Sequence, residues 1–384
     1  MNDFHFNTPG TIIFRTGSSG DTETYKSLIK AGRTLLVTDS TLQKLGIADK
    51  VQTALEGSGA DVLVYDKVEP EPNAATVRDI AETAKGENVI QVIGLGGGSP
   101  MDVAKIASLM IPHPQPIESM YGVGQAEGVR LPLILIPTTA GTGSEGTPVA
   151  VVTGDDGEKS PVIGPQFICD SVILDAELTL ALPPGVTAAT GIDAMVHSIE
   201  AYTSGTRKNP VSDQLAIKAL KLLHGNIRTA VMQGNNIDAR GNMLVGSMMA
   251  GLAFANASVG AVHALAYPVG SQFHLSHGES NSVILVPVMR FNLSKAVSLY
   301  ADLGREIIPE CMEVSNMDAA GRLIEEMNRI VPEIGLKDRL SDYGIDEKNL
   351  DTLVDGALKQ ERILSYNIKS IDREDILNVY QSIL

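Results

Sequence analysis

The sequence is poor in cysteine, has no tryptophan and contains no apolar run of membrane-spanning length. Two cysteines, Cys169 and Cys311, cannot build a disulfide framework, which excludes the small secreted folds that depend on one. The opening segment MNDFHFNTPG lacks the basic and then apolar order of a signal peptide. We therefore expect a cytoplasmic protein that does not act on or in a membrane.

Positive charge is also scarce. The 384 residues include 30 lysines and arginines against 46 aspartates and glutamates, a formal net charge of −16. A field of this sign repels a phosphate backbone, and no dense basic cluster overrides it. We do not expect nucleic acid as a partner.

The composition is otherwise that of an ordered globular protein. Hydrophobic residues make up 43% of the chain and charged residues 20%, without a low-complexity tract, so there is enough apolar material for buried cores. The length is more than one ordinary core accommodates and suggests two domains.

The first half alternates short apolar runs with helical stretches. Aliphatic and β-branched residues fill four runs that each end in a turn, at 33–40, 61–68, 88–99 and 131–141. Such strands, separated by helices, predict a parallel sheet covered on both faces. Ligands of these sheets bind beyond the carboxyl ends of the strands, which here are Asp39, the glycines of 94–99 and the loop 137–145.

The second half has a different pattern. Beyond residues 178–191, long segments such as DQLAIKALKLLHGNI have helical periodicity, which predicts an all-helical domain. Pro183 and Pro184 mark the expected junction, because a proline pair disfavours helix and favours a turn. The predicted domains are an α/β domain over 1–182 and a helical domain over 183–384.

Two polar loops follow strands of the predicted sheet. In GLGGGSPMDVAKIAS the backbone of Gly96, Gly97, Gly98 and Ser99 precedes a helix and could bind a pyrophosphate, although a plain tight turn is the alternative. The loop is not the usual G-x-G-x-x-G fingerprint. The second loop, PTTAGTGSE, offers four hydroxyl groups that could bind ribose, phosphate or an amide.

Asp39 ends the first predicted strand. A carboxylate here accepts hydrogen bonds from ribose hydroxyls and repels a 2′-phosphate, which favours NAD over NADP. The alternative is that Asp39 only caps the following helix. Two polar loops in one sheet favour the nucleotide-binding interpretation.

Histidine and aspartate side chains in the second half indicate a metal site. Asp193 and His197 are four residues apart and share one helix face, although such a pair can simply brace a buried helix. His263 lies beside small residues, and His277 and His274 compete for the same role one helical turn apart. Three imidazoles and a carboxylate suit iron or zinc.

The motifs GGGSPMDVAK, PTTAGTGSE, GIDAMVHSIEAY, GLAFANASVGAVHAL and HGESN, in this order and spacing, resemble the iron-dependent (group III) alcohol dehydrogenase family. The resemblance covers essentially the whole chain. It implies a dehydroquinate synthase-like fold, with an amino-terminal dinucleotide-binding α/β domain and a carboxyl-terminal helical metal-binding domain. It also implies a homodimer or a larger homo-oligomer.

The resemblance assigns roles residue by residue. The metal ligands are Asp193, His197, His263 and His277, which decides against His274, and Fe²⁺ is expected, with Zn²⁺ as the alternative. Phe254 matches an aromatic residue that lines the nicotinamide and substrate pocket. The NAD contacts implied are Asp39, Gly96, Gly97, Gly98, Ser99, Asp102, Thr138, Thr139, Thr142 and Lys159.

One departure concerns the proton path. Many members have a histidine four residues after the third ligand, where this chain has Tyr267. We assign Tyr267 and His263 as catalytic residues, although a tyrosine with an ordinary pKa of about 10 is a poor base near neutrality.

The activity implied is hydride transfer between NAD(H) and a primary alcohol or small hydroxy acid and its aldehyde. Short segments are most similar to the 4-hydroxybutyrate dehydrogenase branch, and the tyrosine is shared with hydroxyacid–oxoacid transhydrogenases. The alternatives of other classes are a dehydroquinate synthase-like lyase and a non-catalytic nucleotide-binding protein. A carboxylate substrate would need a cation, for which Lys159 and Arg290 are candidates.

Overall fold

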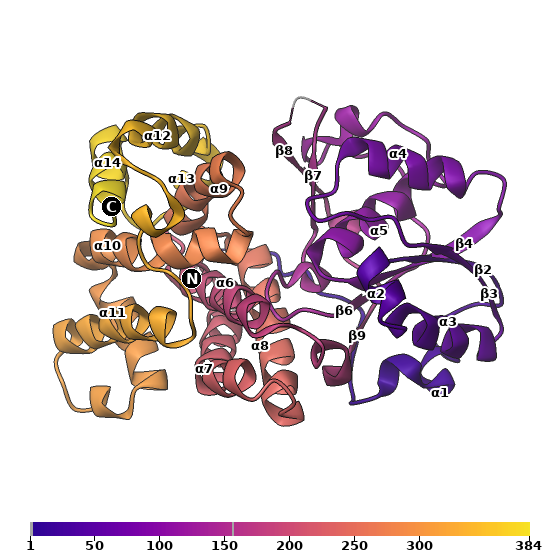
Figure 1. Cartoon of the computed structure of the whole chain (residues 1–384), viewed down its shortest axis with the longest axis horizontal. Coiled ribbons are helices and arrows are strands. Elements are labelled where there is room, and N and C mark those ends of the chain that lie inside the picture. The colour runs from indigo at the N-terminus through magenta and orange to yellow at the C-terminus, as the bar shows by residue number, and fades with distance from the viewer. Residues whose placement is uncertain (1–2, 156) are drawn as a thin grey trace. The chain divides into compact units, whose positions relative to one another are not determined.

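The computed structural model describes residues 3–155 and 157–384. By their internal contacts these residues form two compact units. The α/β unit contains residues 7–139 and 143–181. The helical unit contains residues 140–142, 182–384 and the described residues before Asn7. In Figure 1 the α/β unit runs from indigo to magenta, and most of the helical unit runs from magenta to yellow.

A six-stranded parallel sheet forms the centre of the α/β unit, in the order β1-β9-β6-β4-β2-β3. Its strands are β1 (Thr11–Phe14), β2 (Gly32–Val37), β3 (Ala60–Tyr65), β4 (Val89–Gly96), β6 (Leu133–Pro137) and β9 (Ser171–Leu174). The predicted parallel sheet is confirmed, with β2, β3, β4 and β6 in the four predicted runs. The two short strands β1 and β9 at one edge were not predicted.

Helices cover both faces of this sheet. The register places Leu36, Ile93 and Ile134 side by side, and they pack in one core with residues of α1 (Thr22–Tyr25) and α3 (Ile47–Gly57). On the sheet, Gly94 lies so close to α5 (Gly98–Met110) that an added Cβ would be 2.8 Å from the Ala104 Cβ. The other α-helices in the described part of the unit are α2 (Ser40–Lys44) and α4 (Ala74–Thr83).

A small second sheet packs against α5. It consists of β5 (Gly122–Val123), β8 (Lys159–Ile163) and β7 (Val149–Thr153), with β5 parallel and β7 antiparallel to β8. This sheet was not predicted.

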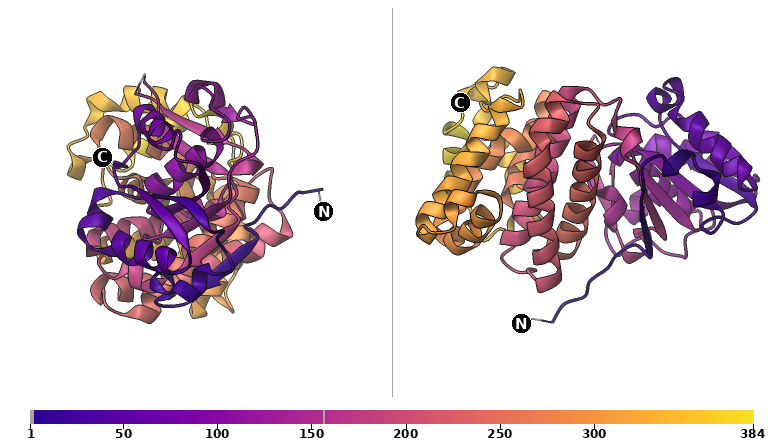
Figure 2. Two further views of the ribbon diagram at one scale, coloured as in Figure 1. Left: turned by 90° about the vertical axis from the view of Figure 1, so that its right-hand side faces the viewer. Right: turned by 90° about the horizontal axis from the view of Figure 1, so that it is seen from below.

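The helical unit contains α6 (Pro184–Thr203), α7 (Pro210–Met232), α8 (Ile237–Ala257), α9 (Ala261–Phe273), α10 (His277–Ile307), α11 (Asn316–Glu333), α12 (Leu350–Leu358), α13 (Glu361–Leu364) and α14 (Arg373–Gln381). The predicted helical half is confirmed. Helix α6 packs against α7, α8 and α10, and the long helices lie side by side in Figure 2. Since α6 has partners on several sides, its residues are buried nearly all round the helix.

Among the described residues, α10 is long and apolar enough to cross a membrane, with a mean hydropathy of 1.3 in its most apolar window. The pair α8 and α9 meets the same test only as one span bent by 109°. However, 56% of the α10 window is buried inside the structure, as in the core helix of a globular protein. This helix is therefore weak evidence for a membrane span.

Candidate metal and cofactor sites

Three helices bring four potential metal ligands together in the helical unit. Asp193 and His197 lie on α6, His263 on α9, and His277 begins α10. One ligand atom from each side chain lies within 4.8 Å of those of the other three. Asp193 Oδ1 is 3.8, 3.7 and 3.5 Å from the Nε2 atoms of His197, His263 and His277 respectively.

These separations suit a divalent transition metal. Ligand atoms at about 2.1 Å from a tetrahedral ion are about 3.4 Å apart, close to the measured values. Asp193, His197 and His263 are buried, and His277 is half-buried. His274 is exposed and has left-handed backbone (φ 56°) at the end of α9. The residues present therefore fit Fe²⁺ or Zn²⁺ without His274.

The start of α10 positions His277. Ser276 caps the helix, because its hydroxyl accepts a hydrogen bond from the Glu279 amide while the Glu279 carboxylate accepts one from the Ser276 amide. This capping box makes His277 the first helical residue. Its ring is consequently held at the end of a rigid element.

Two further residues surround the ligands, and neither was predicted. Glu200 accepts hydrogen bonds from His263 Nδ1 at 2.6 Å and from the Val262 amide at 2.7 Å. The Asn281 amide donates to Asp193 Oδ1 at 2.7 Å. Helical spacing could have indicated both residues. Glu200 is three residues after His197, and Asn281 is four residues after His277, so each shares a helix face with a predicted ligand.

Burial and charge together suit this cluster to a cation. Burial opposes the charged form of Asp193, but the three histidines and the Asn281 amide hold its pKa below the usual value. Burial lowers the pKa of His197 to about 3, so its ring is neutral near pH 7. For His263, burial lowers the pKa, but Glu200 and Asp193 outweigh that effect and raise it.

Replacing Glu200 with glutamine is expected to lower metal affinity by about 10- to 100-fold. Glutamine has one acceptor oxygen for two buried N–H donors, so the His263 ring loses its fixed orientation. The measurement is an anaerobic competition titration with a chromophoric chelator. Glu326→Gln is the control, because Glu326 also pairs with a histidine, His224, at 2.7 Å and outside the cluster, although it carries Arg228 and Arg329 as well. Equal affinities for the Glu200 variant and the unmodified protein would contradict the orienting role.

Two aromatic rings border the ligands. Phe254 stacks on His197, with ring centroids 4.3 Å apart and planes 22° apart. Tyr267 stacks on His277, with centroids 5.8 Å apart. Tyr267 is one helical turn beyond His263 on α9, so its half-buried side chain is beside the metal ligands. The catalytic role of Tyr267 stays a prediction.

The glycine loop joins β4 to α5 in the α/β unit. Gly96 has φ 153° and lies close to Pro100, so a Cβ would be 2.6 Å from its ring. Gly97 caps α5, and Gly98 and Ser99 form its first turn. The Thr138 amide donates to the Gly96 carbonyl at 2.9 Å, so the two predicted loops are adjacent.

The other predicted cofactor contacts lie at several different places in the structure, and some already bind other residues. Thr139 lies beside Gly97, whereas Thr142 groups with the helical unit. Asp39 caps α2, as the alternative interpretation expected, and both bonds end on Oδ1. The oxygens of Asp102 accept from Ser144 Oγ at 2.6 Å and the Val151 amide at 2.9 Å. These assignments stay predictions.

The two candidate carboxylate-binding cations already pair with acidic side chains. Lys159 lies 2.5 Å from Glu71, and Arg290 lies 3.2 Å from Glu325. Arg290 is on the exposed side of α10. Neither pairing indicates a carboxylate substrate.

A buried lysine that was not predicted connects the two cofactor loops. Lys105 Nζ donates to the Ser144 carbonyl and hydroxyl, both at 2.7 Å, and to the Val149 carbonyl at 2.7 Å. Burial lowers its pKa, while Asp102 opposes that effect. Because Lys105 is on α5, it fixes the 144–149 segment against the helix that the glycine loop begins.

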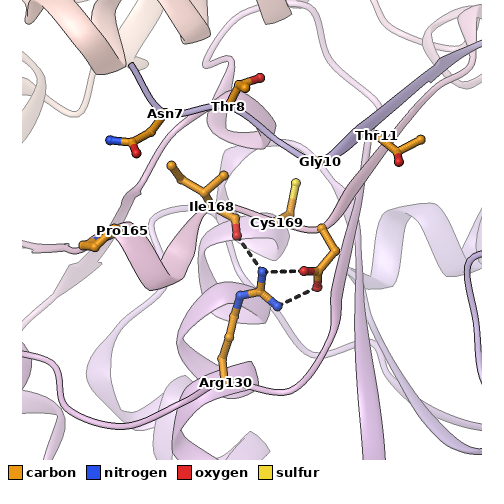
Figure 3. Close-up of a pocket in the computed structure, with 9 residues that line it drawn as sticks. Asn7, Thr8, Gly10, Thr11, Arg130, Pro165, Ile168 and Cys169 are labelled. Atoms are coloured by element: carbon orange, nitrogen blue, oxygen red, sulfur yellow. Dashed lines mark hydrogen bonds and ion pairs between the residues drawn. The ribbon is translucent and has the colours of Figure 1, made fainter. Parts of the chain in front are cut away.

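A surface pocket of about 560 Å³ in the α/β unit lies around Arg130 and Cys169. Figure 3 shows that Arg130 is turned toward Asp170 and the Ile168 carbonyl. Its other donors bond to the Gln166 and Leu131 carbonyls. The pocket contains none of the predicted site residues, and its arginine serves the fold.

Relatives of known type match nearly the whole chain. It is 39% identical to long-chain-alcohol dehydrogenase 1 of Geobacillus thermodenitrificans over 351 residues, 91% of this chain and 88% of the relative. A solved 1,3-propanediol oxidoreductase superposes with a TM-score of 0.95, at 32% identity and full coverage of both chains. The NAD⁺ complex of sulfoacetaldehyde reductase from Bifidobacterium kashiwanohense has a TM-score of 0.89 at 28% identity, covering 100% of this chain and 99% of that one.

Family comparisons give the same result in both halves. Residues 9–176 match the family described as iron-containing alcohol dehydrogenase, and residues 187–384 match the carboxyl-terminal part of the Fe-containing alcohol dehydrogenase family. Together with the relatives, these matches confirm the prediction of an iron-dependent, NAD-linked oxidoreductase that acts on alcohols and aldehydes. The chain belongs to the iron-containing alcohol dehydrogenase family.

Proposed function

We propose that this protein interconverts a primary alcohol and its aldehyde by hydride transfer with NAD(H), at Fe²⁺ held by Asp193, His197, His263 and His277. The observation that carries the proposal is the cluster of these four ligands, three of them buried, with separations suited to one cation. A non-catalytic nucleotide-binding protein would have no need of such a cluster.

The bound metal would supply Lewis acidity that lowers the pKa of an alcohol, and NAD would supply the hydride acceptor. The protein residues supply orientation and charge. Glu200 keeps the Nδ1 proton on His263, so that the Nε2 lone pair faces the other ligands. Phe254 packs against His197 and fixes its ring plane. Tyr267, beside His277, is the residue we propose for moving the proton of the alcohol.

For the cofactor, we propose that the backbone of Gly96, Gly97 and Gly98 and the start of α5 bind the diphosphate. The Asp39 carboxylate would accept a hydrogen bond from an adenosine ribose hydroxyl through Oδ2. Its negative charge disfavours a 2′-phosphate, so we expect NAD(H) rather than NADP(H) to be used.

The substrate class is tested with anaerobically purified protein loaded with Fe²⁺ or, in parallel, with Zn²⁺. NADH formation and consumption are followed with simple alcohols, diols and ω-hydroxy acids and their aldehydes. We expect turnover of uncharged primary alcohols, because Lys159 and Arg290 are already paired with carboxylates. Preference for 4-hydroxybutyrate and succinic semialdehyde would favour the hydroxy acid branch instead. Exchange between a hydroxy acid and an oxo acid without added NAD would favour a transhydrogenase.

The same assay tests the alternative of another class. Release of inorganic phosphate from a sugar phosphate, without net change in NADH, would support a lyase and contradict the proposal. We also expect a homo-oligomer located in the cytoplasm, on the basis of the family resemblance and the cysteine content. Light scattering after size-exclusion chromatography tests the oligomeric state.

A further inference from the structure

Asn281 is a buried amide at the metal cluster whose role no ligand assignment explains. It is fully buried on α10, one helical turn after His277. Its Nδ2 atom lies 2.7 Å from Asp193 Oδ1, 3.2 Å from His277 Nε2 and 3.3 Å from His263 Nε2. The amide nitrogen is thus in hydrogen-bond range of three of the four ligand atoms.

The amide has donors where the ligands have lone pairs. In the neutral His263 ring, the proton that faces Glu200 is on Nδ1, so Nε2 is an acceptor. One N–H of Asn281 is donated to Asp193, and the same nitrogen is 3.3 and 3.2 Å from the Nε2 atoms of His263 and His277, which can accept the second N–H in their Nδ1-protonated neutral forms. The amide therefore occupies the same lone pairs that a cation would use.

The two kinds of contact respond differently to a cation. A neutral imidazole nitrogen has a single lone pair, so the two longer contacts end when the metal binds. A carboxylate oxygen has lone pairs for both a metal and an N–H donor, so the 2.7 Å bond to Asp193 can persist. Among the described residues, Asn281 Oδ1 has no hydrogen-bond partner. The Asn281 side chain is therefore held mainly by the hydrogen bonds that its NH₂ group donates toward the metal ligands.

We propose that Asn281 is a positioning residue of the metal site. Its amide keeps the Nε2 atoms of His263 and His277 directed inward and holds Asp193 Oδ1 beside them. When a cation replaces it at the histidines, the bond to Asp193 continues to orient that ligand. This inference rests on the proposed metal site.

The test compares Asn281→Leu, which has a similar volume without donors, with the unmodified protein. Affinities for Fe²⁺ and Zn²⁺ and the rate of metal association are measured anaerobically by chelator competition. We expect affinity to fall by about 10- to 100-fold, the usual effect of losing an outer-shell partner, with slower association. Asn256→Leu is the matched control, because Asn256 is also buried, on α8, and donates to the Leu252 carbonyl outside the cluster. Its metal affinity should be unchanged.

A second readout separates positioning from packing. In metal-free protein with ¹⁵N-labelled histidine, Asn281→Leu should shift the Nε2 signals of His263 and His277, because both lose a donor. If the leucine variant does not fold, Asn281→Asp keeps the shape and removes the donor, and the same two signals should shift. Unchanged signals, or metal affinity within twofold of the unmodified protein, would overturn the inference.

His263→Ala is measured alongside. If it loses the metal while Asn281→Leu retains it, only the role of Asn281 fails. If His263→Ala retains full metal affinity, the proposed metal site itself fails.

Discussion

The His263→Ala variant is expected to lose its metal and its turnover while keeping its fold. His263 supplies one of four ligand atoms, so affinity should fall by more than the roughly 10- to 100-fold that an outer-shell partner accounts for. Among the described residues, Glu200 accepts from His263 Nδ1 and the Val262 amide, so the change leaves this buried carboxylate with the amide alone and without the cation that would offset its charge. Bound metal is measured by elemental analysis after gel filtration, and turnover by NADH consumption.

His274→Ala is the control for this variant. His274 is exposed and lies at the end of the same helix, so its loss should affect neither metal content nor rate. NAD affinity of His263→Ala should also be retained, because the proposed diphosphate loop belongs to the α/β unit. Full activity of His263→Ala, with metal bound, would refute the site assignment.

Gly278→Ala should both destabilise the helical unit and displace the metal ligand His277. A Cβ at this position would lie 2.1 Å from the carbonyl oxygen of Ala189, a backbone atom of α6 that cannot rotate away. Moving α10 away from α6 to relieve the clash also moves His277 away from Asp193, since His277 is adjacent in the chain. Overpacking of this kind costs about 1–3 kcal/mol and sometimes more.

The effect is measured as a lower midpoint of chemical unfolding and as weaker metal binding in the same variant. Gly225→Ala serves as the control, because Gly225 lies in helix α7 and has nothing within 4 Å of an added Cβ. That change should stabilise by about 0.5–1 kcal/mol, since alanine is the better helix former. A Gly278→Ala variant with unchanged stability and metal affinity would show that the α6–α10 approach does not position the site.

The α/β half was predictable because buried parallel strands have a simple pattern. Strands β2, β3 and β4 contain near-continuous apolar runs, since both faces of the sheet are covered. Strands β1 and β9 have only four residues each, too few for any pattern, and β1 is largely exposed. Strand β9 joins the sheet by pairing with β6, and β1 forms the edge by pairing with β9, and both pairings link segments far apart in the chain.

The sequence by itself determined the fold class, the family and the candidate ligands, because apolar periodicity and five ordered motifs are local properties of the chain. Only the tertiary structure decided which partners these residues have. Glu200 reaches His263 across 63 positions, Asn281 reaches Asp193 across 88, and Lys105 reaches Ser144 across 39. Hydrogen bonds between distant segments form only where helices and loops pack together. That packing depends on close backbone approaches, such as Gly278 against Ala189, and a local sequence pattern does not show which segments approach each other.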